Sequence, residues 1–320
     1  MKEIWREIVL SVFMAMVLPG ILLNWPVEES PNDEIEFRPK ETQQSQNRVR
    51  LTMRLRKGDG SVEEMDLEEY LVGVVLAEMP STFELEAKKA QAVAARTFAR
   101  KAYVTGGKHG DGSVCSDPGC CQAYLTNENY LQMGGSEEAM EEAKAAVEAT
   151  SGLVLTYGGV LIEATYFSCS GGSTEDAVAV WGTDFPYLRA VDSPGEENAA
   201  HHEDTMHFTK QELETKLGVK LTGKWLGKMT YTTGGGVDTI PLGGKIFTGK
   251  QLRSLLGLRS TAFSIDAAGN EITITTRGFG HRVGMSQYGA DAMAVSGSSF
   301  EEILAHYYPG TTLELTNKPG

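Results

Sequence analysis

One carboxylate in this sequence stands where a general acid could be built. Glu78 follows Leu67, Leu71 and Val74 by 11, 7 and 4 residues, and at 3.6 residues per turn all four side chains share one face of a helix. A carboxyl group on an apolar face is desolvated, which raises its pKa and keeps it protonated near neutral pH. Such a group can protonate a leaving oxygen, as glycosidic cleavage requires. The alternatives are that Glu78 turns into solvent at the helix end or pairs with Arg96.

A second group of residues has the composition of a metal site. His109, Cys115, Cys120 and Cys121 lie within 13 residues, in the spacing H-x5-C-x4-C-C. Thiolate and imidazole ligands on one short loop can close a tetrahedral zinc site. The alternative is disulfide bonding, in which the three loop cysteines form an odd set and one of them reaches Cys169 or stays free.

Polar side chains that could meet a substrate occur near the middle of the chain. Tyr166, Ser168 and Ser170 alternate before two glycines, and in a strand this spacing puts all three on one face. We expect them to bind substrate; a core tyrosine followed by turn serines is the alternative. Cys169 would face the opposite way, which favours a buried packing residue over a thiol nucleophile paired with His281.

Three further residues are candidates for the same site. Arg96 lies 18 residues after Glu78 in a second helical stretch, where its guanidinium could hold Glu78 or a substrate carboxylate by two hydrogen bonds, or could simply lie on the helix surface. His281 and Gln287 stand in a glycine-rich stretch, and we expect both in the pocket; a structural histidine and a helix-capping glutamine are the alternatives. The histidines at 201, 202 and 207, with Glu203 and Asp204, could bind a metal, but the stretch is polar and has no helix face. They are therefore interpreted as part of a solvated loop.

The elements that must position these residues follow from hydrophobic periodicity and end signals. A Gly- and Cys-bearing loop spans 107–135, and Gly158-Gly159 indicates a hairpin. Helices and strands do not alternate regularly, so the sequence predicts an α+β fold. The predicted helices are 65–79, 84–103, 136–150, 210–217, 249–256 and two short ones within 286–308; the predicted strands are 49–55, 153–157, 160–167, 262–266 and 271–275.

The beginning of the chain predicts a membrane anchor. Residues 1–7 carry Lys2 and Arg6 and form a cytoplasmic tip, and 8–25 is an uncharged run near the minimum length for a membrane helix. A cleaved signal peptide and a buried core helix are the alternatives. The polar stretch 26–48 is interpreted as a flexible tether. The domain outside the membrane is then 49–320, with a possible second lobe at about 186–276.

Composition excludes one class of partner. The chain has 43 acidic and 29 basic residues and a net charge of −14. Nucleic-acid binding needs a basic surface to neutralise phosphates, so no nucleic-acid partner is expected. The hydrophobic fraction of 41% is enough for a sizeable core.

Three ordered motifs carry a family resemblance. The first is LEEYLVGVVLAEMPSTFELEAKKAQAVAARTFARKAY, from 67 to 103, and the second is GGST followed by WG and PYL, from 171 to 188. The third is GFGHRVGMSQYGA, from 278, with HYYPG after it. Together they closely resemble the stage II sporulation protein D family over 49–312.

The resemblance implies an activity and partners. It implies a lytic transglycosylase that degrades peptidoglycan glycan strands, already stripped of stem peptides, into 1,6-anhydromuramyl products during sporulation engulfment. The family's catalytic glutamate maps to Glu78, and ring closure by the sugar's own hydroxyl explains why one acid suffices. Implied partners are stage II sporulation proteins P, an amidase, and M, a membrane scaffold. A non-enzymatic activator of an amidase is the competing hypothesis.

The resemblance also bears on the metal and on location. Some family members carry zinc in the corresponding loop, which favours one structural zinc per chain on His109, Cys115, Cys120 and Cys121; the family pattern has histidine where Cys120 stands. A closed site of four protein ligands implies no catalytic cofactor. The implied location is the mother-cell membrane, with the catalytic domain facing the intermembrane space.

Overall fold

The computed structural model describes residues 51–316, which lie in a compact unit running from Arg48 to Gly320. The predicted tip 1–7, anchor 8–25 and tether 26–48 fall outside the described residues. None of the helices between 51 and 316 has the length and apolar character needed to cross a membrane. The described chain mixes helices with small sheets, as predicted for an α+β fold.

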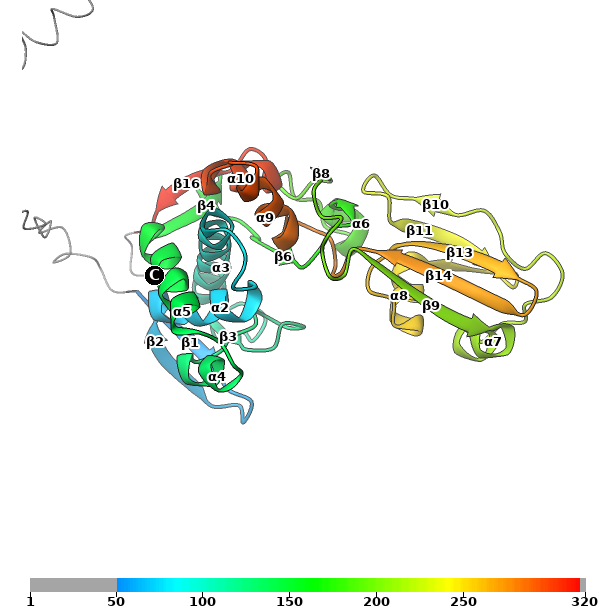
Figure 1. Ribbon diagram of the computed structural model, residues 1–320, viewed down its shortest axis with the longest axis horizontal. Helices are drawn as coiled ribbons and strands as arrows, with labels where there is room; N and C mark the ends of the chain where they lie inside the picture. Colours follow the sequence, from blue (N-terminus) through cyan, green and yellow to red (C-terminus); the bar gives the residue numbers. More distant parts are fainter. Residues whose placement is uncertain (1–50, 317–320) are drawn as a thin grey trace, which may run out of the picture. The chain divides into compact units, whose positions relative to one another are not determined.

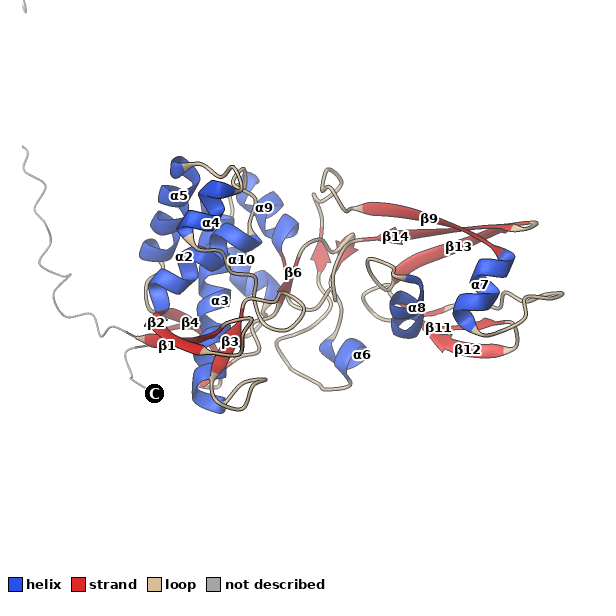
Figure 2. Ribbon diagram, turned by 90° about the horizontal axis from the view of Figure 1, so that it is seen from below, coloured by secondary structure: helices blue, strands red, loops and turns tan. Residues whose placement is uncertain are grey.

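A bundle of three helices forms the first core. The alanine-rich α3 (Leu85–Thr105) packs against α2 (Leu67–Glu78) and α5 (Glu137–Ala149), as Figures 1 and 2 show. Small alanine side chains let the helix axes approach closely. The Asp66 carboxylate caps α2 by accepting the Glu69 amide at 3.1 Å, which satisfies an otherwise unpaired donor.

The C-terminal helices form a further hydrophobic cluster on another face of α3. Both α9 (Gln287–Val295) and α10 (Phe300–Tyr307) contact α3, and Ser299 and Glu302 form a capping box at the start of α10. Strand β4 (Leu153–Tyr157) also packs on α3. The chain segment after residue 285 therefore lies against the helix bundle that begins at residue 67.

Small sheets flank the bundle. Strand β1 (Thr52–Arg56) pairs antiparallel with β2 (Val62–Asp66) and parallel with β3 (Ser113–Cys115). Strand β4 pairs with β5 (Val160–Leu161) and with β16 (Thr312–Leu315). The stretch 107–135, predicted as a loop, therefore contains β3 and also a short helix, α4 (Asn127–Gln132).

The predicted strand 160–167 is wrong as a single element. Strand β5, which pairs with β4, ends at Leu161. The chain then turns, and the Thr165 amide donates a hydrogen bond to Glu163 O at 2.9 Å. It then enters β6 (Tyr166–Phe167), which pairs parallel with β15 (Met285–Ser286). This pairing sets Tyr166 opposite Met285, two residues before Gln287.

A separate hydrophobic core lies between Phe208 and Ile274, within the stretch 186–276. One sheet has the order β13-β14-β9 and another the order β10-β11-β12. Their members and helices are β9 (Glu203–Thr209), α7 (Lys210–Leu217), β10 (Thr230–Tyr231), β11 (Val237–Leu242), β12 (Lys245–Thr248), α8 (Gly249–Leu256), β13 (Ala262–Ala268) and β14 (Glu271–Arg277).

The helices and strands around this second core agree with the predicted elements in part. Helices α7 and α8 have the predicted bounds. The solvated-loop interpretation of the histidine-rich stretch is wrong from residue 203 onward, because β9 pairs with β14 over seven residues and sets His207 opposite Thr273. The alternation of polar and apolar residues that would indicate β9 is weak, because most of its side chains are polar and exposed, as they would be in a loop.

Candidate functional site

Glu78 is the last residue of α2 and is partly buried. Its Oε1 atom accepts a hydrogen bond from the Ala123 amide at 2.7 Å, and its Oε2 atom accepts one from Gln287 Nε2 at 3.0 Å. Val74 and Leu71, one and two turns earlier on the same face, are fully buried. The helix therefore presents one carboxylate at the end of an apolar face, as the spacing predicted.

Burial raises the pKa of Glu78 above its ordinary value, and the hydrogen bonds from Gln287 and Ala123 partly oppose this rise. Burial acts because an ionised carboxyl loses hydration. Both of these hydrogen-bond donors are neutral, and no charged group among the described residues contributes to the pKa shift of Glu78. Arg96 is not among the groups that hold Glu78, so the alternative of an Arg96–Glu78 pair is wrong. The carboxyl group is thus set to carry a proton at a higher pH than an exposed glutamate.

Gln287 reaches Glu78 because of the parallel pair β6–β15. It is the first residue of α9, it is 6% exposed, and Ser286 rather than Gln287 caps that helix, with its hydroxyl accepting the Gly289 amide at 3.2 Å. The capping alternative for Gln287 is therefore wrong. Its side-chain amide instead binds Glu78, which lies 209 positions earlier in the chain. Gln287 is therefore part of the candidate site.

Tyr166 lies beside this carboxylate within a buried polar chain. The Tyr166 hydroxyl accepts a hydrogen bond from Gln122 Nε2 at 2.8 Å, and Gln122 Oε1 accepts one from the Tyr70 hydroxyl at 3.1 Å. Burial raises the pKa of both phenols well above the ordinary value, and the nearby Glu78 charge adds to the rise. Tyr166 is therefore a neutral group that faces Glu78 and is braced by Gln122.

His281 occupies an aromatic enclosure near the same strand. Its ring lies 5.3 Å from Trp181 and 5.6 Å from Phe167, centroid to centroid, and its Nδ1 atom accepts the Val283 amide at 3.1 Å. Burial, with a smaller contribution from Arg253, lowers the pKa of His281 to about 4. The imidazole is therefore neutral at pH 7. Its described hydrogen bonds do not include Glu78.

Arg96 does not belong to the site as predicted. Its side chain is fully buried and binds Glu68 with two hydrogen bonds, from Nε at 2.8 Å and from Nη2 at 2.5 Å. Nη1 also donates to Leu153 O at 3.2 Å and to Thr150 Oγ1 at 3.5 Å, and Nη2 donates to Val147 O at 3.3 Å, so that all five N–H groups have an acceptor. A guanidinium with these partners has no donor left for a substrate. Arg96 instead joins α3 to α2, α5 and β4.

Replacing Arg96 with methionine is expected to lower the free energy of unfolding by about 3–5 kcal/mol, because it leaves the partly buried Glu68 charge and two carbonyl groups without a donor. Urea denaturation followed by circular dichroism measures this change. Arg54→Met is the matched control, since the Arg54–Glu64 pair is exposed and contributes little. An Arg96→Met protein of normal stability would contradict the structural assignment.

Ser168 and Ser170 do not share a substrate-facing side with Tyr166, because β6 ends at Phe167. Ser170 is fully buried, and its hydroxyl donates to Glu196 Oε2 at 2.9 Å. The Ser168 carbonyl accepts the amide of Tyr288 at 3.0 Å. The predicted substrate role of the Ser170 side chain is therefore wrong. That of Ser168 stays a prediction.

Glu196 is a buried carboxylate that the sequence analysis did not find. Its Oε1 atom accepts the hydroxyl groups of Ser193 at 2.7 Å and Ser286 at 2.6 Å. Its Oε2 atom accepts the Ser170 and Gly171 amides at 2.7 and 2.9 Å. Glu196 thereby fastens β15 and the start of α9, the elements that position Gln287. Nothing in its own sequence surroundings indicates this role.

Cys169 is buried, as predicted, and its thiol donates to Glu196 Oε2 at 3.2 Å. Burial and the Glu196 carboxylate raise the pKa of the Cys169 thiol to about 12. The thiol is protonated at neutral pH, which excludes a nucleophilic role. The potential ligand atoms of Cys169, Glu196 and His202 lie within 4.8 Å of one another. Because Glu196 Oε2 already accepts several donors, this group is structural.

Arg282 connects the glycine-rich motif to the second core. It is 2% exposed, and its guanidinium donates to Glu175 Oε1 at 3.2 Å and to the carbonyl groups of Ser170 and Gly234 at 2.8 Å each. Arg282 has a φ of 66°, which non-glycine residues rarely adopt. The hydrogen bonds of the buried guanidinium hold the residue in this conformation. The backbone beside His281 is thereby fixed.

The four loop residues proposed as metal ligands do come together. The ligand atoms of His109, Cys115, Cys120 and Cys121 lie within 4.8 Å of one another. Cys121 Sγ lies 3.8 Å from Cys120 Sγ and 3.6 Å from His109 Nε2. Tetrahedral zinc with bonds of about 2.3 Å to sulfur and 2.0 Å to nitrogen spaces its ligand atoms by about 3.5–3.8 Å. All four cysteines of the chain are free thiols. The donor set therefore fits zinc.

The loop backbone sets this geometry. The amides of Cys120 and Cys121 both donate to Asp117 O, at 3.0 and 2.8 Å, and Lys108 Nζ donates to Cys120 O. Cys115 is held separately, as the last residue of β3. The loop then continues directly from Cys121 into the segment that donates to Glu78.

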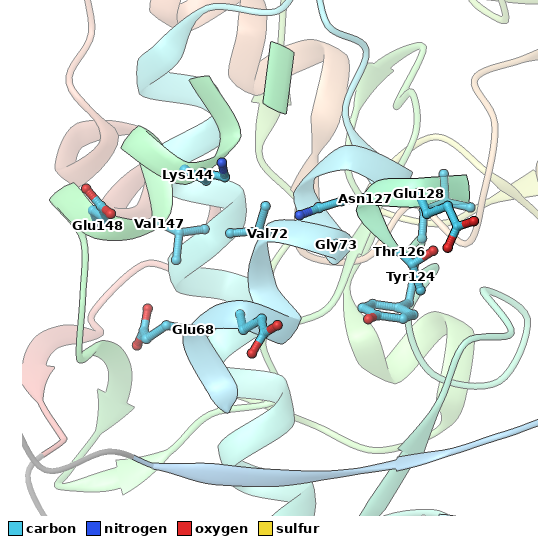
Figure 3. Close-up of a pocket in the computed structure, with 12 residues that line it drawn as sticks. Glu68, Val72, Gly73, Tyr124, Thr126, Asn127, Glu128, Lys144, Val147 and Glu148 are labelled. Atoms are coloured by element: carbon cyan, nitrogen blue, oxygen red, sulfur yellow. The ribbon is translucent and has the colours of Figure 1, made fainter. Parts of the chain in front are cut away.

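A cavity of about 580 Å³ lies on the other side of that segment. Figure 3 shows Tyr124, Thr126 and Glu128 on one side of it and Lys144, Val147 and Glu148 on the other. Four glutamates and one lysine line the cavity, which disfavours an anionic ligand. Glu78 is not among its lining residues, so this cavity is separate from the carboxylate described above.

Comparisons with known proteins match the chain to one family. Residues 56–157 match the family model described as stage II sporulation protein, SpoIID. The chain is 43% identical over 264 residues to stage II sporulation protein D of Bacillus subtilis strain 168, which covers 81% of this chain and 77% of that protein. The Bacillus amyloliquefaciens protein of the same name gives the same identity and coverage.

A more distant relative has a different name. The chain is 30% identical over 302 residues to a Bacillus subtilis protein named amidase enhancer, a match that covers 76% of this chain and 40% of that protein. The two stage II relatives match at higher identity and over most of their own length. The chain therefore belongs to the stage II sporulation protein D family.

Proposed function

We propose that this protein is a lytic transglycosylase that cleaves peptidoglycan glycan strands during sporulation, with Glu78 as the catalytic acid and base. The observation that supports this most directly is the state of Glu78. It is a partly buried carboxyl with a raised pKa, held by two neutral donors, Ala123 and Gln287. The two structural carboxylates are held differently: Glu68 pairs with the guanidinium of Arg96, and Glu196 accepts six donors on its two oxygen atoms.

The reaction requires two proton transfers at one carboxyl group. Glu78 first donates its proton to the glycosidic O4 atom as the bond from C1 to that oxygen breaks. The C6 hydroxyl of the same muramyl residue then attacks C1, and Glu78 removes the hydroxyl proton. The new C1–O6 bond closes the 1,6-anhydro ring, no water is consumed, and Glu78 is protonated again.

A single acid is consistent with the described surroundings of Glu78. A glycoside hydrolase generally places a second carboxylate opposite the first, to act as base or nucleophile. No described carboxylate contributes to the pKa shift of Glu78. Tyr166, which interacts with Glu78, and His281, which packs against the neighbouring Phe167, are both neutral at pH 7. These uncharged groups are suited to hydrogen bonding with sugar hydroxyls, and neither can replace the missing second acid.

Incubation with glycan stripped of its stem peptides tests the proposal. We expect mass spectrometry of the products to show 1,6-anhydromuramyl ends, which have lost one water relative to the products of hydrolysis. Products with reducing muramyl ends would indicate a hydrolase instead. No cleavage at all would contradict an enzymatic function.

The second candidate is a glycan-binding activator of a cell-wall amidase. It is favoured by the relative named amidase enhancer, at 30% identity. An activator would raise the rate at which an amidase removes stem peptides and would cleave no glycan alone. Adding Glu78→Gln protein to an amidase assay separates the two functions, because an activator has no need of that proton.

Location and partners follow from the same proposal. We propose that residues 8–25 anchor the protein in the mother-cell membrane, with 49–320 in the intermembrane space. Stage II sporulation protein P would supply stripped glycan by its amidase activity, and protein M would hold the complex at the membrane. The net charge of −14 is consistent with a partner other than nucleic acid.

We propose one structural zinc per chain on His109, Cys115, Cys120 and Cys121. The support is the tetrahedral spacing of the ligand atoms and their closed set of four. When bound, the metal would cross-link the loop; with no open coordination position it would take no part in proton transfer. Glu78 alone then carries the acid and base steps.

The rate of glycan cleavage is expected to fall as the pH rises through the pKa of Glu78, because only the protonated carboxyl can donate. The Gln287 amide lowers that pKa, so Gln287→Met should move the alkaline limb of the profile to higher pH while lowering the maximal rate. Gln211→Met on α7 is the control, and its profile should match wild type. A Gln287→Met limb at lower pH would contradict this electrostatic role.

A further inference from the structure

The segment that donates to Glu78 is fastened at both ends. It runs from Gln122 to Leu125 and lies along α2, where the Leu125 amide donates to Gly73 O at 3.1 Å. A Cβ atom at Gly73 would come within 2.4 Å of both Leu125 O and the Tyr124 ring. Only glycine therefore permits the segment to lie this close to the helix.

The other end of the segment is fastened by the Gln122 side chain, which is 1% exposed. Its Nε2 atom donates to the Tyr166 hydroxyl at 2.8 Å, and its Oε1 atom accepts the Tyr70 hydroxyl at 3.1 Å. Nε2 also lies 3.5 Å from Ala95 O on α3. One amide thus connects α2, α3 and β6.

Between these fastenings lies the Ala123 amide, 2.7 Å from Glu78 Oε1. A backbone amide is a donor only, so Oε1 must accept from it whether or not Glu78 is protonated. Gln287 differs, because its side-chain amide can donate to a carboxylate or, after rotation, accept from a carboxyl proton. The proton of Glu78 is therefore directed to Oε2.

We propose that Gln122 is a positioning residue for the acid–base group: by holding the Ala123 amide against Glu78 Oε1, it makes Oε2 the oxygen that donates and removes the proton. This proposal rests on the proposed transglycosylase function for its catalytic meaning. Gln122 itself touches neither Glu78 nor a reacting atom; it acts through the backbone of the next residue. A purely structural Gln122 would stabilise the fold without affecting the titration of Glu78.

The test compares two methionine substitutions of buried glutamines. Gln122→Met removes all three hydrogen bonds of the side chain. Gln91→Met is the matched control, because Gln91 is fully buried on α3 and its side chain has no hydrogen-bond partner among residues 51–316. The protein is labelled with ¹³C at the glutamate carboxyl carbons, the Glu78 signal is assigned by its loss in Glu78→Gln, and that signal is titrated with pH.

Gln122→Met is expected to raise the Glu78 titration midpoint by about one pH unit, because the ionised form loses a stabilising donor, while Gln91→Met leaves it unchanged. The phenols of Tyr70 and Tyr166, which also face Glu78, do not titrate in this range. An unchanged midpoint in folded Gln122→Met overturns the proposal. If that variant does not fold, Tyr166→Phe, which removes one partner of Gln122, should give a smaller rise, and no rise overturns the proposal.

The readout uses no glycan, so it remains decisive if the protein proves not to cleave glycan. Steady-state kinetics then test whether this positioning affects catalysis. If wild type forms anhydro products, Gln122→Met should lower kcat about tenfold with KM nearly unchanged, since orientation of the acid matters in the transition state. A loss confined to KM would indicate a substrate-binding role and would contradict positioning.

Discussion

Glu78→Gln is expected to lower the rate of anhydromuramyl product formation by about a thousandfold or more. General acid–base catalysis commonly contributes about 10²–10⁴-fold, and here one carboxyl group would serve both proton transfers. Glutamine has nearly the same shape and can still accept the Ala123 amide through its side-chain oxygen. The substitution therefore removes the proton while keeping the local structure.

Stability separates a chemical effect from a structural one. An amide at residue 78 avoids burying a charge, so Glu78→Gln should unfold at the same temperature as wild type or at a higher one. Glu69→Gln, an exposed position on the same helix, is the control and should retain full activity. Substantial activity in Glu78→Gln would assign the acid role to another residue.

How much of this site the sequence predicts depends on how local each interaction is. The position of Glu78 on a buried helical face follows from the 3.6-residue period, and the Asp66 cap and the bounds of α7 and α8 are likewise local. The periodicity does not identify the partner of a long side chain. Arg96 was predicted to reach Glu78 or a substrate, but the packing of α3 on α2 brings it to Glu68, about three turns earlier.

The groups that hold Glu78 were the least predictable part. Gln287 was found from its motif, although its contact with Glu78 depends on the two-residue pair β6–β15, too short for any alternation to show. The Ala123 donor is a backbone amide, which leaves no trace in the side-chain pattern. Gln122 had one available signal: it is a polar residue that directly follows the last metal ligand candidate, Cys121, and so lies where that loop meets the helix bundle.

The metal loop leads to the second large prediction: purified protein should contain about one zinc per chain, and chelation should loosen residues 108–125. Four ligands from a single loop bind zinc with a free energy that is also folding free energy. The loop reaches Glu78 through Gln122 and Ala123, so we expect metal removal to speed hydrogen exchange at the Ala123 amide. Exchange mass spectrometry before and after chelation measures this directly.

Cysteine variants decide where the metal is bound. Cys115→Ser removes one ligand from the closed set and should abolish the zinc content and lower the unfolding temperature, while Cys169→Ser should keep one zinc because its thiol binds Glu196. Fresh protein without zinc, in which thiol titration shows disulfides, would contradict the metal proposal. A loop that zinc cross-links up to Cys121 should restrain the segment that follows it. Rapid hydrogen exchange at the Ala123 amide in protein that still holds zinc would therefore contradict a coupling between the metal and Glu78.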